Sequence, residues 1–277
     1  MKKVVIIGGG FAGAKIAKAM EKKFDVTLID RKNYFEFTPG VLRTIIEPSH
    51  TNKIQVCHSN YLKKSEIKKD KISKIENDYV KTKSGKKINF DYLIIASGSS
   101  YNSPFKKKDL IITTRLTHLE KNNKKLESAK NILIIGGGIV GVELAAEIIK
   151  KYPEKKVIII HQGERLMQRN QEKTSEYARK FLEKNNVKII LDDTVNKIKK
   201  NEVITSKNKR IKYDLVFLCT GINPNSEFIR KKHLDENSFI KVNEFLQAQN
   251  KNIFAAGDIT SIKEEKTAQN AENHAKI

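Results

Sequence analysis

Short runs of apolar residues, separated by polar stretches, recur along the chain and predict the strands of parallel sheets. Lys3–Ile7 and Val26–Ile29 are two such runs, and both are rich in the β-branched residues typical of strands buried on both faces. Between them, a stretch rich in Ala, Lys and Ile has the pattern of a helix that continues to about Lys23. The chain therefore begins with a predicted βαβ unit whose second strand ends at Asp30.

The turn between the first strand and the helix reads Gly8-Gly9-Gly10-Phe11-Ala12-Gly13. In this G-x-G-x-x-G pattern, Gly8 permits a tight turn, Gly10 lets the backbone approach a pyrophosphate, and Gly13 allows close helix–strand packing. The helix N-terminus presents free N–H groups to phosphates, and Asp30 can accept hydrogen bonds from an adenosine ribose. The turn therefore predicts a dinucleotide site.

The same arrangement recurs 128 residues later, with Asn131–Ile135 as the strand, Val142–Lys151 as the helix and Val157–Ile160 as the partner strand. The second turn reads Gly136-Gly137-Gly138-Ile139-Val140-Gly141. One such turn is weak evidence, but two copies, each between a strand and a helix, are strong evidence for two dinucleotide sites. Such a chain pairs a flavin with a nicotinamide, or handles two nucleotides.

The second copy differs at the end of its second strand, where His161 stands in place of an acid. This change removes the carboxylate that rejects a 2′-phosphate, and Arg165 lies nearby in the sequence. We therefore expect either NADH or NADPH to be accepted. A solvent-facing His161 with no ligand contact is the alternative.

Three further predicted strands end in small residues, at the sheet edge where open α/β sheets bind ligands. The first ends at Ala96-Ser97-Gly98, the second at Cys219-Thr220-Gly221, and the third leads into Gly257-Asp258. The pattern as a whole predicts an α/β fold with two Rossmann-like dinucleotide-binding domains.

Charge and cysteine content narrow the class of protein further. Lys and Arg number 54 against 32 Asp and Glu, a net charge of +22 that is spread along the whole chain. This is typical of a compositional bias, but it leaves open contact with a membrane surface or with nucleic acid. Two cysteines, Cys57 and Cys219, allow neither a disulfide scaffold nor a Cys-rich metal site, and no metal is expected. With no long apolar run, the chain is expected to be soluble and cytoplasmic, with a membrane-peripheral position left open.

Together, the two glycine turns, the small-residue turns and the late Ala-Ala-Gly-Asp resemble the FAD-dependent pyridine nucleotide-disulfide oxidoreductase superfamily. Within it, the chain resembles the apoptosis-inducing-factor-like branch that includes the ferroptosis suppressor proteins, and next the type II NADH:quinone oxidoreductases. The stretches that carry this resemblance are Glu143–Ile148, Tyr152–Lys155, Leu218–Asn223, Lys241–Glu244 and Leu246-Gln247.

The resemblance implies a discontinuous FAD-binding domain, residues 1–112 and 246–277, with an NAD(P)H-binding domain, residues 113–245, inserted into it. Relatives continue into an antiparallel interface domain that covers the flavin and often dimerises. That domain is expected to be absent, in a natural short form or in a fragment, and homodimer formation stays open.

The resemblance also implies roles for individual residues. Arg43 matches an FAD-contacting arginine, Gly257-Asp258 the site of the ribityl and phosphate groups, and Ala268–Ala271 a short helix whose N-terminus faces the isoalloxazine ring. A surface charge is the alternative for Arg43, and a helix cap is the alternative for Gln269. The expected FAD site comprises Gly8, Gly9, Gly10, Phe11, Ala12, Gly13, Asp30, Arg31, Arg43, Ala96, Ser97, Gly98, Gly257, Asp258 and Ala268. The expected NAD(P)H site comprises Gly136, Gly138, Ile139, Val140, Gly141, Glu143, His161, Cys219, Thr220 and Gly221.

The implied reaction is hydride transfer from NAD(P)H to FAD, followed by electron delivery to a quinone-like or other small-molecule acceptor. Glu143 and Gln269 are the catalytic candidates; Glu143 is expected to orient the nicotinamide, with a charge in the first helical turn as the alternative. The sequence lacks a C-x-x-C pair, which excludes a disulfide relay, and Cys219 is interpreted as a packing residue. A low-turnover sensor of NAD(P)H and FAD, and a basic polyanion-binding flavoprotein, are the alternative functions.

Overall fold

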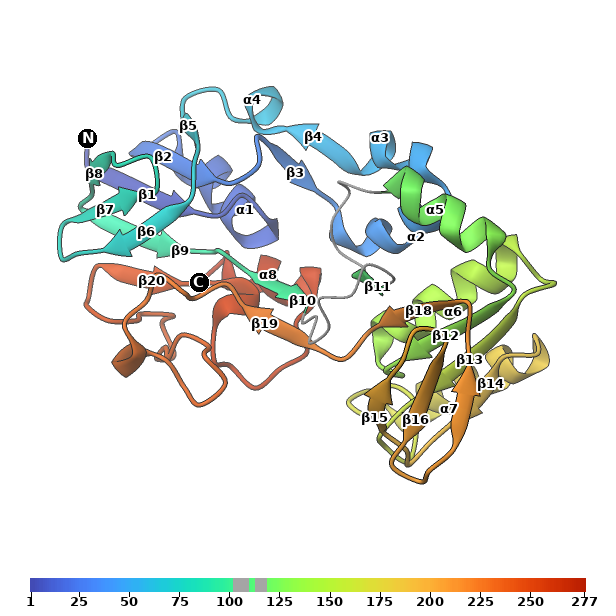
Figure 1. Ribbon diagram of the computed structural model, residues 1–277. Coiled ribbons are helices and arrows are strands. Elements are labelled where there is room, and N and C mark those ends of the chain that lie inside the picture. The colour runs from blue at the N-terminus through green and yellow to red at the C-terminus, as the bar shows by residue number, and fades with distance from the viewer. Residues whose placement is uncertain (102–109, 113–118) are drawn as a thin grey trace. The chain divides into compact units, whose positions relative to one another are not determined.

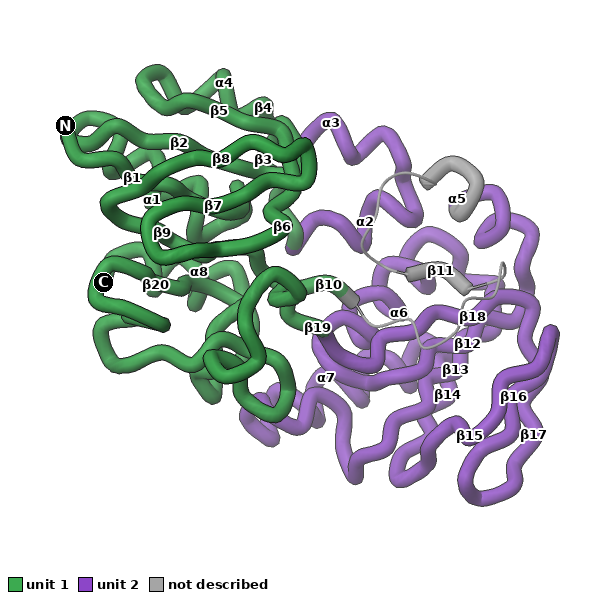
Figure 2. Tube along the Cα trace, turned by 60° about the vertical axis from the view of Figure 1, so that its left-hand side comes forward, with its two compact units in different colours: residues 1–38, 54–100, 223–277 green, residues 39–53, 101–222 purple. Residues whose placement is uncertain are grey.

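The computed structural model describes residues 1–101, 110–112 and 119–277. The chain forms two compact units, residues 1–38, 54–100 and 223–277 and residues 39–53 and 101–222 (Figure 2). Each unit contains a five-stranded parallel sheet (Figure 1), so the predicted α/β fold class is confirmed.

In the first unit, the parallel strands follow the order β20-β9-β1-β2-β5. Their bounds are β1 Lys3–Ile7, β2 Asp25–Asp30, β5 Glu66–Lys69, β9 Tyr92–Ile95 and β20 Ile253–Ala255. Alternate side chains of β1 enter two different cores, because successive residues of a strand point to opposite faces. Val4 and Ile6 pack with residues of α1 (Phe11–Met20) and α8 (Ala268–His274). Val5 and Ile7 pack beneath a three-stranded antiparallel sheet, β6 Ile72–Ile75, β7 Tyr79–Thr82 and β8 Lys87–Asn89.

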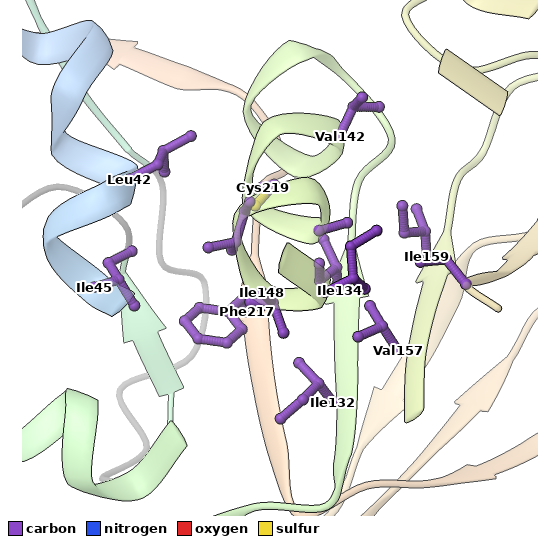
Figure 3. Packing of buried hydrophobic residues seen from close by; sticks show 14 of the residues in the cluster. Leu42, Ile45, Ile132, Ile134, Val142, Ile148, Val157, Ile159, Phe217 and Cys219 are labelled. Carbon is purple, nitrogen blue, oxygen red and sulfur yellow. The ribbon is translucent and has the colours of Figure 1, made fainter. Parts of the chain in front are cut away.

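The second unit repeats this plan with the parallel order β11-β18-β12-β13-β14. Its strands are β11 Leu110–Ile112, β12 Asn131–Ile135, β13 Lys156–Ile160, β14 Lys188–Ile190 and β18 Leu215–Leu218, and its longer helices are α5 Leu119–Ser128, α6 Ile139–Lys151 and α7 Glu172–Lys184. Ile132 and Ile134 of β12 pack against Ile148 of α6 (Figure 3). Leu133 and Ile135 lie in the core that includes Ile198 and Val203 of the antiparallel sheet β15 Val195–Ile198, β16 Glu202–Thr205 and β17 Arg210–Lys212.

Shorter elements complete the chain. They are β3 Tyr34–Glu36, which pairs with β4 Gln55–Cys57; β10 Ser99–Tyr101, which pairs with β19 Ile222–Pro224; and the helices α2 Val41–Ile46, α3 Thr51–Ile54 and α4 His58–Tyr61.

The compact units differ in three places from the domain boundaries predicted from the resemblance. Residues 101–112, predicted to end the first part of the FAD-binding domain, group with the second unit, where β11 pairs with β18. Residues 39–53 group with the second unit, because Leu42 and Ile45 of α2 join its core (Figure 3) and the Asn123 side chain donates to the carbonyl of Ile45 at 3.2 Å. Residues 223–245 group with the first unit, because Ile240 is buried in its core and donates its N–H to the Ile259 carbonyl at 2.8 Å.

Among the described residues, no helix has both the length and the apolar composition needed to cross a membrane. The same residues contain no group of three or more His, Cys, Asp or Glu placed to hold a metal ion.

Candidate functional site

The three glycines of the first turn serve different purposes. Gly8 has a φ of +99°, and a Cβ on it would lie 2.2 Å from the carbonyl oxygen of Ala96. A Cβ on Gly13 would lie 1.9 Å from the carbonyl oxygen of Gly8, so the fold itself requires both glycines. A Cβ on Gly10 would meet no described atom within 4 Å. The missing side chain at Gly10 therefore leaves space for a group outside the chain.

The second turn has the same geometry at every one of these positions. Gly136 has a φ of +110°, and its Cβ would lie 2.2 Å from the carbonyl oxygen of Cys219. A Cβ on Gly141 would lie 1.9 Å from the Gly136 carbonyl oxygen, whereas one on Gly138 would meet no described atom within 4 Å. Both turns, Gly8–Gly13 and Gly136–Gly141, therefore leave open space at their third glycine, and each such turn is called a cradle below.

Each cradle is completed by the N-terminus of a helix. α1 begins at Phe11 and α6 at Ile139, directly after Gly10 and Gly138 in extended conformation. No described side chain caps either helix, and neither has an acidic residue in its first turn. The first amides of both helices are therefore available to an anionic group, and the positive end of each helix dipole favours one. These cradles fit the pyrophosphate of a dinucleotide.

Asp30 lies against the first turn, at the end of β2. Its Oδ2 accepts the N–H of Gly9 at 2.6 Å and its Oδ1 accepts the N–H of Lys32 at 3.0 Å. Burial raises the pKa of Asp30, but the neighbouring His58 and the two amide donors outweigh this and hold the pKa below its usual value. The carboxylate is therefore ionised at neutral pH and available to accept further hydrogen bonds.

His161 occupies the equivalent position in the second unit, after β13. Its Nδ1 accepts the N–H of Gly137 at 3.2 Å, as Asp30 accepts that of Gly9. Burial lowers the pKa of His161 more than the nearby charge of Asp192 raises it, so the ring is neutral at pH 7. With Nδ1 acting as acceptor, the remaining proton is on Nε2, which has no described hydrogen-bond partner.

A loop after His161 holds the second turn from the other side. Met167, in the left-handed region at φ +49°, donates its N–H to the Gly137 carbonyl at 2.8 Å. The guanidinium of Arg165 donates to the carbonyls of Gln168 at 2.7 Å and Asn170 at 3.1 Å. These terminal nitrogens of Arg165 therefore brace the loop.

Side-chain hydrogen bonds join the small-residue turns of the first unit to neighbouring segments. Ser97 Oγ donates to the Asn225 carbonyl at 2.9 Å, and the Asn225 amide donates back to the Ser97 carbonyl at 2.8 Å. Ser99 Oγ donates to Asp258 at 2.7 Å, and burial raises the pKa of Asp258 despite this bond. Gly98 has a φ of +63° with open space around its Cβ position.

The segment from Gly257 to α8 is fixed by a buried histidine. His274 accepts the Gly257 N–H on Nδ1 at 3.0 Å, and its Nε2 lies 3.0 Å from Glu264. α8 begins at Ala268, and Thr267 caps it by accepting the N–H of Asn270 at 3.2 Å. The N-cap is thus Thr267, so the helix-cap alternative for Gln269, an exposed residue in the first turn, is wrong.

Arg43 and Glu143, predicted for different cofactors, line one cavity of about 480 Å³ within the second unit. Burial raises the pKa of Glu143, and the charge of Glu147 adds to this effect. The first turn of α6 contains no acidic residue, so the alternative of a first-turn charge is wrong for Glu143. Arg43 pairs with Glu47 at 3.3 Å, on the exposed side of α2.

Cys219 lies in the core of the second unit (Figure 3), and burial raises the pKa of its thiol to about 12. It is therefore a neutral thiol at physiological pH, in agreement with its interpretation as a packing residue. Its carbonyl is the group against which Gly136 packs. The adjacent Thr220 and Gly221 are exposed, as is Arg31 beside Asp30.

Sequence reasoning missed several residues that hold these turns: His58, Tyr61, Met167, Asn225 and His274. None belongs to a local sequence motif, and tertiary structure brings each of them next to its glycine turn or small-residue turn. Only Asn225, four residues after the second small-residue turn, stood close to a recognised pattern.

Two parallel sheets, each with an open glycine cradle and a free helix N-terminus, are the architecture of a protein that binds two dinucleotides. The profile of the family "Pyridine nucleotide-disulphide oxidoreductase" matches residues 2–275, so the chain belongs to this family. Apoptosis-inducing factor homolog B of Dictyostelium discoideum is 34% identical over 308 aligned residues, covering 100% of this chain and 79% of that protein. Ferroptosis suppressor protein 1 of Mus musculus is 31% identical over 292 residues, covering 99% and 78%. The water-forming NADH oxidase from Lactobacillus brevis bound to NADH superposes with a TM-score of 0.84 at 20% identity, covering 99% of this chain and 68% of that one.

The family match and the fold confirm the predicted superfamily and the predicted cofactors. The chain is a flavin-dependent NAD(P)H oxidoreductase, with FAD and NADH or NADPH as its cofactors.

Proposed function

We propose that this oxidoreductase transfers electrons from NAD(P)H through FAD to a quinone or a quinone-like small molecule. The observation that carries the proposal is the repeated cradle, since a chain with two open dinucleotide sites can hold an electron donor and a flavin together. The quinone is supported by the resemblance to type II NADH:quinone oxidoreductases. It is supported further by the cysteines, because Cys57 and Cys219 are both free thiols and offer no disulfide to receive electrons.

In this proposal the first unit holds FAD, which supplies a ring that accepts hydride and releases electrons. The amides after Gly10 bind its pyrophosphate, and the carboxylate of Asp30 accepts from the adenosine ribose. The second unit holds NAD(P)H in the same manner, with the amides after Gly138 on the pyrophosphate and His161 beside the adenosine ribose, in the position that Asp30 has in the first unit. Glu143 orients the nicotinamide.

The test is anaerobic addition of NADH to the purified flavoprotein, followed by an acceptor. We expect the flavin absorbance near 450 nm to bleach with NADH and to return when a short-chain ubiquinone is added. Steady NADH oxidation with that quinone supports the proposed enzyme. Bleaching without turnover on quinone or dyes would favour the sensor, and a flavin that NADH does not bleach would overturn the electron-transfer function.

A matched variant separates the nicotinamide site from the flavin site. A Cβ at position 138 meets no described atom within 4 Å, so Gly138→Val should fold and keep its flavin while it occupies the open space of the second cradle. It should lose bleaching by NADH because the backbone can no longer approach the pyrophosphate. Dithionite should still bleach the flavin of this variant, which shows that the flavin itself remains reducible.

A further inference from the structure

His58 is fully buried beside the first glycine turn, and its imidazole ring lies close to polar groups. A Cβ on Gly9 would lie 2.4 Å from Cε1 of His58 and 2.6 Å from Oδ2 of Asp30, so the ring and the carboxylate meet at the middle of the turn. The His58 backbone is fixed as well, because its N–H donates to the Asn33 carbonyl at 3.0 Å. Burying an imidazole without polar partners lowers the stability of the fold relative to an apolar side chain. The partners of the two ring nitrogens therefore matter.

The two ring nitrogens of His58 have different partners. Nδ1 lies 2.5 Å from the hydroxyl oxygen of Tyr61, and Nε2 lies 3.4 Å from Oδ2 of Asp30. The contact with Asp30 lacks the geometry of a hydrogen bond, and within the described residues Nε2 has no hydrogen-bond partner. Burial, and then the charge of Asp30, raise the pKa of Tyr61, so its hydroxyl keeps its proton.

This arrangement places a proton on the nitrogen that faces Asp30. When the ring is neutral, the Tyr61 hydroxyl donates to Nδ1 and the ring proton is on Nε2. When the ring is protonated, Nε2 also carries a proton. The remaining tautomer would set a lone pair of Nε2 against a carboxylate, which is electrostatically unfavourable. An N–H therefore faces Asp30 in both favourable states.

Asp30 itself is almost fully used by the protein. A carboxylate offers about four acceptor positions. Oδ2 accepts from Gly9 and faces His58, while Oδ1 accepts from Lys32. Oδ1 has one acceptor position without a described donor. Two amide hydrogen bonds and the close contact with His58 thus restrict the rotation of the carboxylate.

We propose that His58, held by Tyr61, is a positioning residue that orients the Asp30 carboxylate for the adenosine ribose of FAD. The proposal rests on the proposed assignment of Asp30 to that ribose. The consequence is preorganisation. The Asp30 carboxylate is held in its orientation before the ribose hydroxyl binds, so Asp30 loses less rotational freedom on binding.

The experiment measures the Kd of FAD for reconstituted apoprotein in a double-mutant cycle of His58 and Asp30. His58→Leu removes the N–H at similar volume and should raise the Kd about tenfold. His58→Gln can still donate from its amide and should recover most of this loss, and Tyr61→Phe should weaken FAD in the same direction but less. In the Asp30→Asn background, His58→Leu should change the Kd by less than about twofold, because its target is gone.

The outcomes separate this proposal from the assignment on which it rests. An unchanged Kd in Asp30→Asn would show that Asp30 does not bind the ribose, and both would fall. A weakened Asp30→Asn with an unchanged His58→Leu would overturn the role of His58 alone. An equal loss from His58→Leu in both backgrounds would show a packing effect and would also overturn it. Urea unfolding followed by far-UV circular dichroism reports whether the first unit of each variant, which contains all the substituted residues, is folded.

Discussion

Coenzyme choice should depend on the charge of the side chain at position 161. Replacing His161 by Asp introduces a carboxylate at the place where Asp30 stands in the first unit and where it accepts a glycine N–H at 2.6 Å. The wild-type ring is neutral, because burial lowers the pKa of His161, so it neither repels nor attracts a 2′-phosphate strongly. We therefore expect wild-type kcat/KM values for NADH and NADPH within about tenfold, or 1.4 kcal/mol.

The size of the change follows from Coulomb's law. Two unit charges about 4 Å apart interact by about 1 kcal/mol in water and about 4 kcal/mol near a protein surface of effective dielectric 20. The site is half-buried, so a loss of about 1.4–2.8 kcal/mol for NADPH is expected in His161→Asp, a factor of about 10 to 100 relative to NADH. His161→Asn is the matched control, since it accepts the Gly137 N–H without a charge and should keep the wild-type ratio.

The assay is steady-state NADH and NADPH oxidation with a dye acceptor, at low and high salt. The Asp variant should regain part of its NADPH activity as salt rises, because screening weakens repulsion between accessible charges. Equal NADPH:NADH ratios in the Asp and Asn variants would refute the reasoning and would remove His161 from the coenzyme site.

Two further predictions concern the first unit. Gly10→Val should fold but release its flavin, because a Cβ there meets no described atom yet blocks the ligand; a normal flavin-to-protein ratio would remove this turn from the FAD site. Glu21→Gln should lower stability by about 2 kcal/mol at pH 7. Burial raises the pKa of Glu21, but the amides of Lys64 and Lys63 and the Lys18 ammonium lower it from 4.5 to about 2. This contribution is present above pH 4.5 and is lost as pH falls toward 2, so urea unfolding should separate wild type and variant at pH 7 and not at pH 2; an equal gap at both would contradict it.

The repeated βαβ units could be predicted from the sequence because their signals are local. A β-branched run, a glycine turn and a helical pattern follow one another within about 25 residues, and Lys3–Ile7 and Asn131–Ile135 are strands with the expected bounds. The grouping of residues 39–53 with the second unit had no such signal. The apolar side chains of Leu42 and Ile45 indicate that one face of α2 is buried, but the sequence does not show which of the two cores buries it.

The same distinction separates the predicted site residues from the missed ones. Gly10 and Asp30 belong to one motif whose spacing is fixed by a strand, a turn and a helix. His58 lies close to Asp30 because β3 pairs with β4, which returns the chain to the glycine turn. The short helix α4 follows β4, begins at His58 and ends at Tyr61. Contacts of this kind depend on tertiary pairing, and a single sequence contains no periodicity that reveals them.

The equivalence of Asp30 and His161 limits how coenzyme preference can change during evolution. In both units, this side chain must first accept the N–H of the central glycine before it can interact with a ribose. Lysine and arginine carry no acceptor, so either would leave that amide unpaired and loosen the turn that binds the pyrophosphate. Positive charge for a 2′-phosphate must therefore come from a neighbouring position. Natural variation at position 161 is expected to stay among aspartate, glutamate, asparagine, glutamine, serine, threonine and neutral histidine.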